Sequence, residues 1–384
     1  MISSPRYLFD EGQKSVPCVR AKNYVTDGGK NMNRRAFLGR SLMATIGMAL
    51  GGMIYPISSL ASAMNGTSLI DRMLIIDPHA HPDMDPEYWK GPSAGFRFMK
   101  EVGMAASGYC AIGDFWQKSI LSGSYYDIAV KMIDYWVNTV VQKGDVKLVL
   151  KISDIPEPGT GKPGALLGLE GGDALEGRAD RVDEFYKLGV RIITIVRVHN
   201  NELGDMMRAL SDLDPGPYNG GLTPKGRVVI DRMQELGMVV DVAHASTATL
   251  KDVVAHCKKP IIDSHTDLCA AGQNCGRSRS WKEMEWIAST GGVVCCSPVG
   301  WGKKPTKTFR DWANELFDMK KNIGIDHIGI GTDDGSGFPK VSGYKDIRDL
   351  GKLAEALTDV GFTRGELAAF MGKNVYRVLG KYLL

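Results

Sequence analysis

The sequence predicts an α/β protein whose strands close into a single (β/α)8 TIM barrel. Short apolar runs rich in β-branched residues alternate about eight times with amphipathic helical stretches. No glycine-rich nucleotide turn follows the first run, which disfavours an open doubly wound sheet. Histidines and carboxylates stand at the ends of several runs, where a barrel gathers its functional residues. Together these three observations favour one barrel domain over two separate domains.

Composition limits the class of protein. The chain has 384 residues, of which 43% are hydrophobic and 24% charged, and this excludes disordered, collagen-like and coiled-coil chains. Its seven cysteines are few and odd in number, which argues against a disulfide framework. The net charge of +3 comes from residues 1–63, which carry eight Lys or Arg and three acidic residues. The remainder is slightly acidic, so we expect no nucleic-acid partner.

Residues 32–63 are predicted to be a twin-arginine signal peptide. Arg34 and Arg35 lie in a motif at 33–39, an apolar run follows at 42–55, and the small residues of 61–63 resemble a cleavage site. The run is shorter than the ~20 residues that span a bilayer, so no permanent anchor is expected. The alternative is an ordinary N-terminal helix. Residues 1–31 are interpreted as an upstream or disordered extension, and the protein as periplasmic or otherwise exported by the twin-arginine machinery.

Residues 64–384 are predicted to form one domain. The expected strands are 73–77, 103–112, 165–169, 191–196, 238–242, 260–263, 292–296 and 327–331. The expected helices include 182–189, 312–323, 364–379 and one that begins at Thr223-Pro224 and ends at Gly237. Residues 155–164 and 212–221 are rich in proline and glycine and are expected to be loops.

Six metal-capable residues fall at the carboxyl ends of five predicted strands. They are His79 and His81 after the first strand, Glu170 after the third, His244 after the fifth, His265 after the sixth and Asp333 after the eighth. Because these strand ends meet at one face of a barrel, we expect the six side chains to lie close together. The chain has only seven histidines, and four of them stand at such positions.

Imidazole and carboxylate ligands indicate a divalent metal, with Zn²⁺ the best match. A glutamate between two histidine pairs can bridge two ions, and such ions generate a nucleophile from water at neutral pH. Each residue also has an ordinary structural interpretation: Glu170 could form a buried salt bridge, and Asp333 could form a turn with Gly335. The cysteines, including the adjacent Cys295 and Cys296, are interpreted as core or incidental thiols.

Several segments have the order and spacing of a known family's motifs. They are 168–172, 201–205, 221–226, 238–246, 262–265 and the closing stretch 372–379. In these segments the chain resembles the membrane (renal) dipeptidases, a family of zinc peptidases, and the similarity covers nearly all of residues 70–380. The resemblance implies a (β/α)8 barrel of the metal-dependent hydrolase type, with two Zn²⁺ ions, that cleaves dipeptides, including those of mixed chirality. A homodimer is the family's usual assembly.

The resemblance also implies roles for individual residues. His79 and the residue two positions later would hold one zinc, Glu170 would bridge, and His244 with His265 would hold the other zinc. Asp333 matches the family's acidic residue near the bridging water, and we expect it to move the proton of that water. Arg277 matches the arginine that binds the substrate carboxylate.

The chain departs from the family pattern at three places. The usual His-x-Asp is His79-x-His81. The histidine that stabilises the oxyanion after the fourth strand is replaced by Arg197, with His199 two residues later, and either could take that role. The usual Asp-Phe-Asp-Gly is shortened to 333–335. We therefore expect an exported zinc dipeptidase that works through an activated hydroxide. Its alternatives are an amidohydrolase for N-acyl amino acids, lactones or cyclic amides, and a non-catalytic binding protein.

Overall fold

The computed structural model describes residues 69–82, 93–112, 114, 123–207, 216–268, 278–299 and 308–384. Within them, eight parallel strands follow one another around a nearly closed barrel, in the order β1, β2, β4, β5, β6, β7, β8, β9. Their bounds are Ile76–Asp77, Ala106–Ile112, Gly164–Glu170, Ile192–Thr194, Val239–Asp241, Ile262–Thr266, Val293–Cys296 and Ile328–Ile330. Each lies at a predicted strand, so the (β/α)8 prediction is confirmed. The short strand β3, Lys147–Leu148, was not predicted and pairs with β4.

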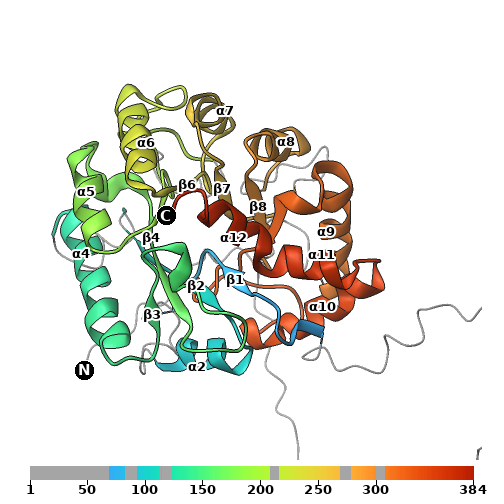
Figure 1. The fold of residues 1–384 in the computed structure, drawn as a ribbon. Helices are drawn as coiled ribbons and strands as arrows, with labels where there is room; N and C mark the ends of the chain where they lie inside the picture. The colour runs from blue at the N-terminus through green and yellow to red at the C-terminus, as the bar shows by residue number, and fades with distance from the viewer. Residues whose placement is uncertain are drawn as a thin grey trace, which may run out of the picture. The chain divides into compact units, whose positions relative to one another are not determined.

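Helices surround the strands, as Figure 1 shows in a view along the barrel. Those of eight residues or more are α2 Ser93–Glu101, α4 Tyr125–Trp136, α5 Asp180–Lys187, α6 Pro224–Leu236, α7 Thr247–His256, α8 Trp281–Ser289, α9 Phe309–Ile323 and α10 Leu350–Asp359. The shorter α11 and α12 span Arg364–Ala368 and Asn374–Leu379. Single turns of 3-10 helix lie at Ile152–Asp154, Gly172–Leu175, Ile325–His327 and Ile347–Asp349, and π-helical turns at Val137–Val141 and Ala369–Lys373.

Helix α6 shows how the sequence sets its own boundaries. The Thr223 side chain accepts a hydrogen bond from the Gly226 N–H, Pro224 occupies the first turn, and Gly237 ends the helix at φ 79°. The predicted start and end are both confirmed. The prediction of one helix over 364–379 holds less well, because π-turns interrupt it around Gly372. A Cβ at that glycine would lie 2.2 Å from the Leu74 carbonyl oxygen, so this stretch needs a glycine to approach the sheet.

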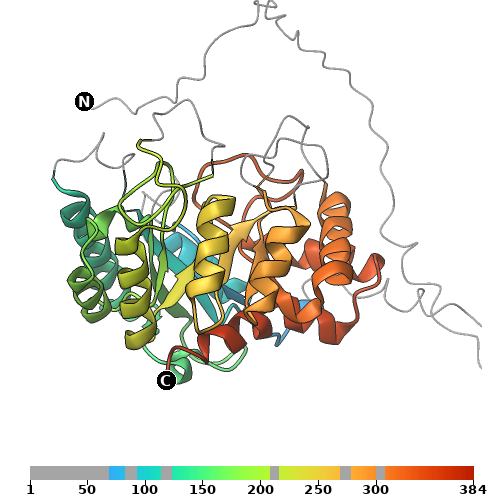
Figure 2. The same ribbon diagram turned by 90° about the horizontal axis from the view of Figure 1, so that it is seen from above.

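Two apolar layers fix the position of the polar end of the barrel. Alternate residues of a strand face opposite ways, so Leu167 packs between sheet and helices while Leu166 packs inside the barrel. The inner layer also contains Val378 and Leu379 of α12. Helix α12 lies across the end of the barrel that bears the C-terminus (Figure 2). Apolar side chains therefore fill that end, and the carboxyl ends of the strands remain for polar residues.

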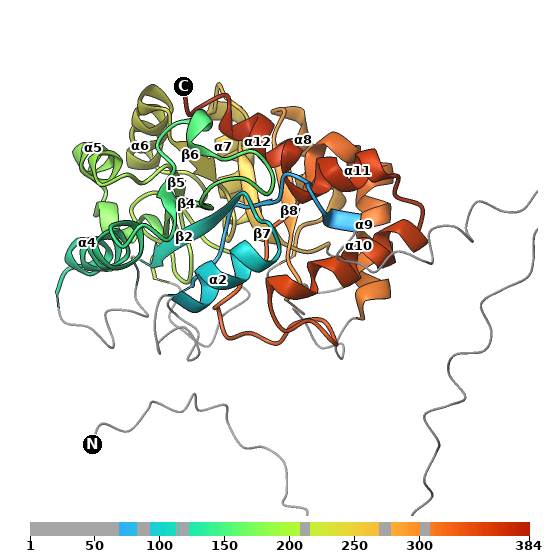
Figure 3. The same cartoon turned by 60° about the horizontal axis from the view of Figure 1, so that its bottom comes forward.

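The seam between β9 and β1 is closed without a regular strand ladder. The His81 N–H donates to the Asp334 carbonyl oxygen at 2.6 Å, beside an isolated bridge between Ala80 and Asp334. The Asp77 carboxylate accepts hydrogen bonds from the Thr332 N–H at 3.1 Å and its hydroxyl at 2.5 Å. Helices α2 and α10, which come from distant parts of the sequence, lie on the same side of the barrel (Figure 3). The first and last strands are thus joined largely through residues at the polar end.

No helix among the described residues has the length and apolar character needed to cross a membrane. The predicted signal peptide at 32–63 and the extension at 1–31 lie outside the described residues.

Candidate metal centre

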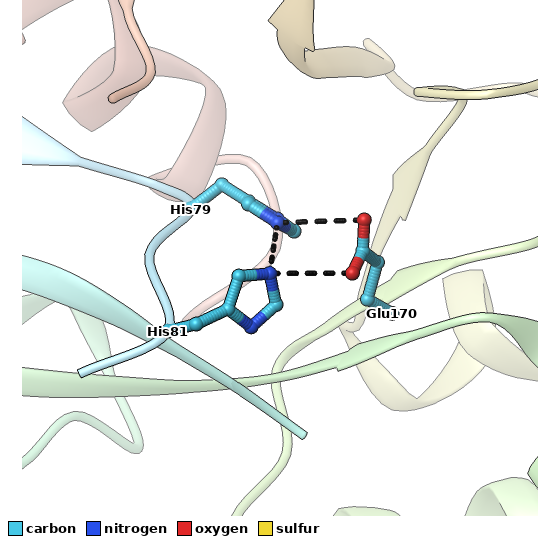
Figure 4. Close-up of side chains that lie close together, drawn as sticks. All are labelled: His79, His81 and Glu170. Carbon is cyan, nitrogen blue, oxygen red and sulfur yellow. Dashed lines mark hydrogen bonds and ion pairs between the residues drawn. The ribbon is translucent and has the colours of Figure 1, made fainter. Parts of the chain in front are cut away.

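The six predicted ligand residues converge on one buried cluster. The exposed fraction of each residue is 6% or less. We call His79 and His81 the first histidine pair, and His244 and His265 the second histidine pair. Glu170 lies between them: its Oε1 is 2.8 Å from His244 Nε2, 3.4 Å from His265 Nε2 and 3.6 Å from His79 Nε2, and its Oε2 is 3.2 Å from His81 Nε2. Figure 4 shows the first pair facing this carboxylate.

Local features of the backbone direct these side chains toward the cluster. His79 and His81 are two residues apart after β1 and point to the same side. The register of β7 shifts between Asp263 and Thr266, and this irregularity lets the consecutive residues Ser264 and His265 both contact the cluster. His244 and Asp333 have left-handed backbones, at φ 65° and 50°. Non-glycine residues in this region are strained, and such strain is typical of functional sites.

Asp333 lies beside the first histidine pair. Its Oδ1 is 3.6 Å from His81 Nε2 and 3.9 Å from His79 Nε2. Three overlapping groups of potential ligand atoms result: the first pair with Glu170, the second pair with Glu170, and His79 with His265 and Asp333. The atoms of each group lie within 4.8 Å of one another. The predicted convergence at one end of the barrel is thus present in the geometry.

Hydrogen bonds at the outer nitrogens of His81 and His265 direct the inner Nε2 lone pairs toward the centre of the cluster. His81 Nδ1 lies 2.9 Å from the Cys110 carbonyl oxygen, which only accepts, so we assign the proton to Nδ1 and a lone pair to Nε2. Ser264 donates its hydroxyl proton to Asp241 at 2.6 Å, and its oxygen accepts from His265 Nδ1 at 2.8 Å. The same assignment follows for His265. Outer hydrogen bonds of this kind orient metal-binding histidines.

The spacing of the inner nitrogens fits divalent ions. The two Nε2 atoms lie 3.0 Å apart in the first histidine pair and 3.1 Å apart in the second. Lone pairs at this separation repel unless a positive charge lies between or beside them. Four imidazole nitrogens and a carboxylate also form the ligand chemistry that zinc prefers. The residues therefore fit a metal centre.

Buried charge is concentrated around this cluster. Burial raises the pKa of Glu170, but Arg197 and the nearby histidines outweigh it and hold the pKa well below its ordinary value. Burial raises the pKa of Asp77 to about 7 and that of Asp241 to about 6, against the hydrogen bonds that each accepts. A cluster of buried, shifted groups at one end of a barrel is typical of an active site.

Arg197 and His199 occupy different surroundings. Arg197 Nε donates to Glu170 Oε2 at 2.6 Å, so it touches the metal-capable cluster directly. His199 Nε2 instead lies 2.8 Å from Asp173 Oδ1. Arg277, the predicted carboxylate-binding residue, lies outside the described residues. Of the two candidates for stabilising an oxyanion, Arg197 is the one with a contact to Glu170.

Sequence reasoning missed the partners that hold these residues. Asp114, just after β2, accepts from Arg197 Nη1 at 2.9 Å and is fully buried. Arg279 is also fully buried; its Nε donates to Asp263 at 2.7 Å, and its other nitrogens donate to the carbonyl oxygens of Val242 and Ala245 on either side of His244. The sequence does show charged residues in otherwise apolar segments at the strand ends. It does not show which of these residues contact one another.

A (β/α)8 barrel with buried imidazoles and carboxylates at the carboxyl ends of its strands defines the class of barrel metallohydrolases. The family model of the membrane dipeptidases, peptidase family M19, matches residues 103–382. The chain belongs to this family of metallopeptidases. The match begins after His79 and His81, so the pair that departs from the family pattern lies outside the matched range.

Comparison with known proteins agrees with this assignment. The chain is 30% identical to dipeptidase verJ of Clonostachys rogersoniana over 57% of its own length and 55% of that protein's. It thus spans about half the length of this curated relative. Among solved structures, an amidohydrolase from Pseudomonas aeruginosa aligns at a TM-score of 0.71 and 23% identity, covering 83% of this chain and 99% of that one.

A metallopeptidase from Rhodobacter sphaeroides, solved with a phosphinate mimic of the dipeptide L-Ala-D-Ala, aligns at a TM-score of 0.69 and 17% identity. That alignment covers 81% of this chain and all of the other. At these identities the structural matches establish the shared fold.

Proposed function

We propose that this chain is an exported, metal-dependent dipeptidase that hydrolyses the amide bond of dipeptides. The observation that carries the proposal is the convergence of both histidine pairs on Glu170, inside a member of the membrane dipeptidase family. The dipeptide mimic bound by the Rhodobacter sphaeroides relative supports a short peptide as substrate.

The proposed cofactor is two Zn²⁺ ions. The first histidine pair with Glu170 would hold one ion, and the second pair with Glu170 would hold the other. When bound, such ions lower the pKa of water toward ~7 and polarise a carbonyl, which supplies a nucleophile at neutral pH.

The chain's own residues would then perform the remaining steps. Asp333 lies beside the first pair, where its carboxylate accepts the proton of the attacking water and returns it to the leaving amine. Arg197 uses Nε and Nη1 for Glu170 and Asp114, and its Nη2 carries two further N–H donors for a developing oxyanion. His199 is the alternative donor. Arg277 is the proposed partner of the substrate carboxylate and would favour short substrates.

Zinc analysis and a substrate panel test the proposal together. Purified protein should contain zinc by elemental analysis and should hydrolyse dipeptides, including L-Ala-D-Ala. Glu170→Gln and Asp333→Asn should remove hydrolysis, while Glu157→Gln, at an exposed carboxylate, should retain it. Zinc-replete protein that cleaves no dipeptide would contradict the proposal.

The same centre supports a second candidate reaction. His81 stands where the family usually has an aspartate, which removes one negative charge from the ligand set. This change favours testing N-acyl amino acids, lactones and cyclic amides beside dipeptides. Turnover of these compounds without dipeptide cleavage would select this alternative.

The proposal of export rests on residues 32–63. Fusion of this segment to a reporter should direct the reporter to the periplasm through the twin-arginine machinery, and Lys in place of Arg34 and Arg35 should block transport. Retention of the intact fusion in the cytoplasm would contradict it. We also propose a homodimer, which light scattering of the purified protein would test.

A further inference from the structure

Arg197 places a permanent positive charge against one oxygen of the central carboxylate. Its Nε lies 2.6 Å from Glu170 Oε2, and its Nη1 lies 2.9 Å from Asp114 Oδ2. The exposed fractions of the Arg197 and Asp114 side chains are 12% and 0%. The guanidinium is therefore held in a fixed position by two carboxylates, largely away from solvent.

The two oxygens of Glu170 consequently have unlike surroundings. Oε1 faces the second histidine pair, with His244 at 2.8 Å and His265 at 3.4 Å, and lies 3.6 Å from His79 of the first pair. Oε2 faces His81 at 3.2 Å and accepts a hydrogen bond from Arg197 Nε at 2.6 Å. A bridging carboxylate would give one oxygen to each ion. An ion at Oε1 would meet an oxygen surrounded by imidazoles, which can lose their protons, while an ion at Oε2 would meet an oxygen that already accepts from a guanidinium.

The charge of Arg197 cannot be removed when a metal arrives. A histidine at this position could lose its proton, but a guanidinium stays protonated at any physiological pH. A divalent ion at Oε2 would also lie close to that positive charge, and like charges repel strongly at short range in a buried site. Asp114 neutralises part of this charge through Nη1, whereas Glu170 is contacted by Nε.

We propose that Arg197 makes the two metal positions unequal. The first ion binds tightly at Glu170 Oε1 with the second histidine pair. The second ion binds more weakly at Oε2 with the first histidine pair, because Arg197 occupies that side of the carboxylate. At limiting metal the protein therefore holds one ion per chain. This inference rests on the binuclear centre of the proposed function.

Metal titration of the whole protein tests the inference without measuring activity. Metal-free protein is titrated with Zn²⁺ against a fluorescent chelator, and with Co²⁺ followed by visible absorption. We expect two binding phases, with the second weaker by roughly 10–100-fold, the range by which neighbours of metal ligands alter affinity. His244→Ala should remove the tight phase, and His81→Ala should remove only the weak phase.

Variants at Arg197 distinguish the effect of its charge on metal affinity from the effect of its packing. Arg197→Met should tighten the second phase by about 10-fold or more and leave the first within a few-fold. Arg197→Lys keeps the charge and should keep the gap between the phases. Asp114→Asn removes one of the two carboxylates that neutralise the guanidinium and should widen the gap. Arg232→Met, at a half-exposed arginine of α6, is the matched control and should leave both phases unchanged.

The double variant of Arg197→Met with Asp114→Asn covers the case in which the single variant fails to fold, because it removes both charges together. Two phases of equal affinity in the wild type, or a gap that survives Arg197→Met or the double variant, would overturn the inference alone. Absence of zinc binding in the wild type would overturn the proposed function as well, so the two failures are distinguishable.

Discussion

The buried pair of Arg279 and Asp263 gives a prediction whose size follows from its geometry. Both side chains are fully buried, and their Nε–Oδ2 distance is 2.7 Å. Arg279 also donates to the carbonyl oxygens of Ala245 and Val242 at 2.7 and 2.6 Å. Arg279→Met leaves the Asp263 charge without its cation, which costs about 3–5 kcal/mol. It also removes the hydrogen bonds from Arg279 to two carbonyl oxygens, which adds about 1 kcal/mol for each bond.

The expected loss for Arg279→Met is therefore about 5–7 kcal/mol, a large part of the ~5–15 kcal/mol by which proteins are stable. Adding Asp263→Leu should restore about 3–5 kcal/mol, because the uncompensated charge is then gone. Urea unfolding measures both losses, and an unchanged slope m shows that only stability has changed. Arg232→Met, which breaks a half-exposed ion pair, is the control and should cost at most about 1 kcal/mol.

A loss below about 1 kcal/mol for Arg279→Met, or a double variant no more stable than the single one, would refute this reasoning. The carbonyls that Arg279 binds flank His244, whose backbone is left-handed. Arg279→Met protein that still folds should therefore also bind zinc about 10–100-fold more weakly in a chelator competition.

Three further predictions concern the metal centre and a helix start. Glu170→Gln should lower zinc content by elemental analysis to less than half of the wild-type value, because both positions use this carboxylate; an unchanged content would contradict the central role of Glu170. Removal of the metal with a chelator should lower the melting temperature of the protein, since a free ion concentration of 1,000 times the Kd stabilises the folded state by about 4 kcal/mol. Equal melting curves with and without chelator would contradict stabilisation by a bound metal. Burial raises the pKa of Glu283, but Arg279 and hydrogen bonds from Ser280 outweigh it and hold the pKa low. Glu283→Gln should therefore cost about 1–2 kcal/mol at pH 7. The wild-type advantage should fade as the pH falls from ~4.3, the pKa of an unfolded glutamate, through the lower pKa of the folded carboxyl; a pH-independent difference in urea unfolding would count against this.

The barrel was predictable because its strands are short and buried and most of them are apolar. Parallel strands covered on both faces read as continuous apolar runs, which is why all eight were found. β3 was missed because it has only two residues, one of them the exposed Lys147. The strand-end ligands were predictable by the same logic, since topology alone brings the carboxyl ends together.

Contacts between distant charged residues were not predictable. Arg197 and Asp114 are 83 positions apart, and Arg279 reaches both Asp263 and the loop around His244. The register shift in β7 was equally hidden, because strict alternation would turn Ser264 and His265 to opposite faces. Each of these features depends on side-chain geometry in the closed barrel rather than on a local pattern.

The closure of the barrel between β9 and β1 constrains how this molecule can change. Hydrogen bonds between Asp77 and Thr332, and between His81 and Asp334, join the first and last strands at the same place where the reaction is proposed to occur. A mutation that changes the proposed reaction at this place therefore also weakens the hydrogen bonds that close the barrel. Engineers seeking new substrates would therefore do better to start on the opposite side, near His244, because the strand β6 that precedes it pairs with β5 over three residue pairs away from this seam.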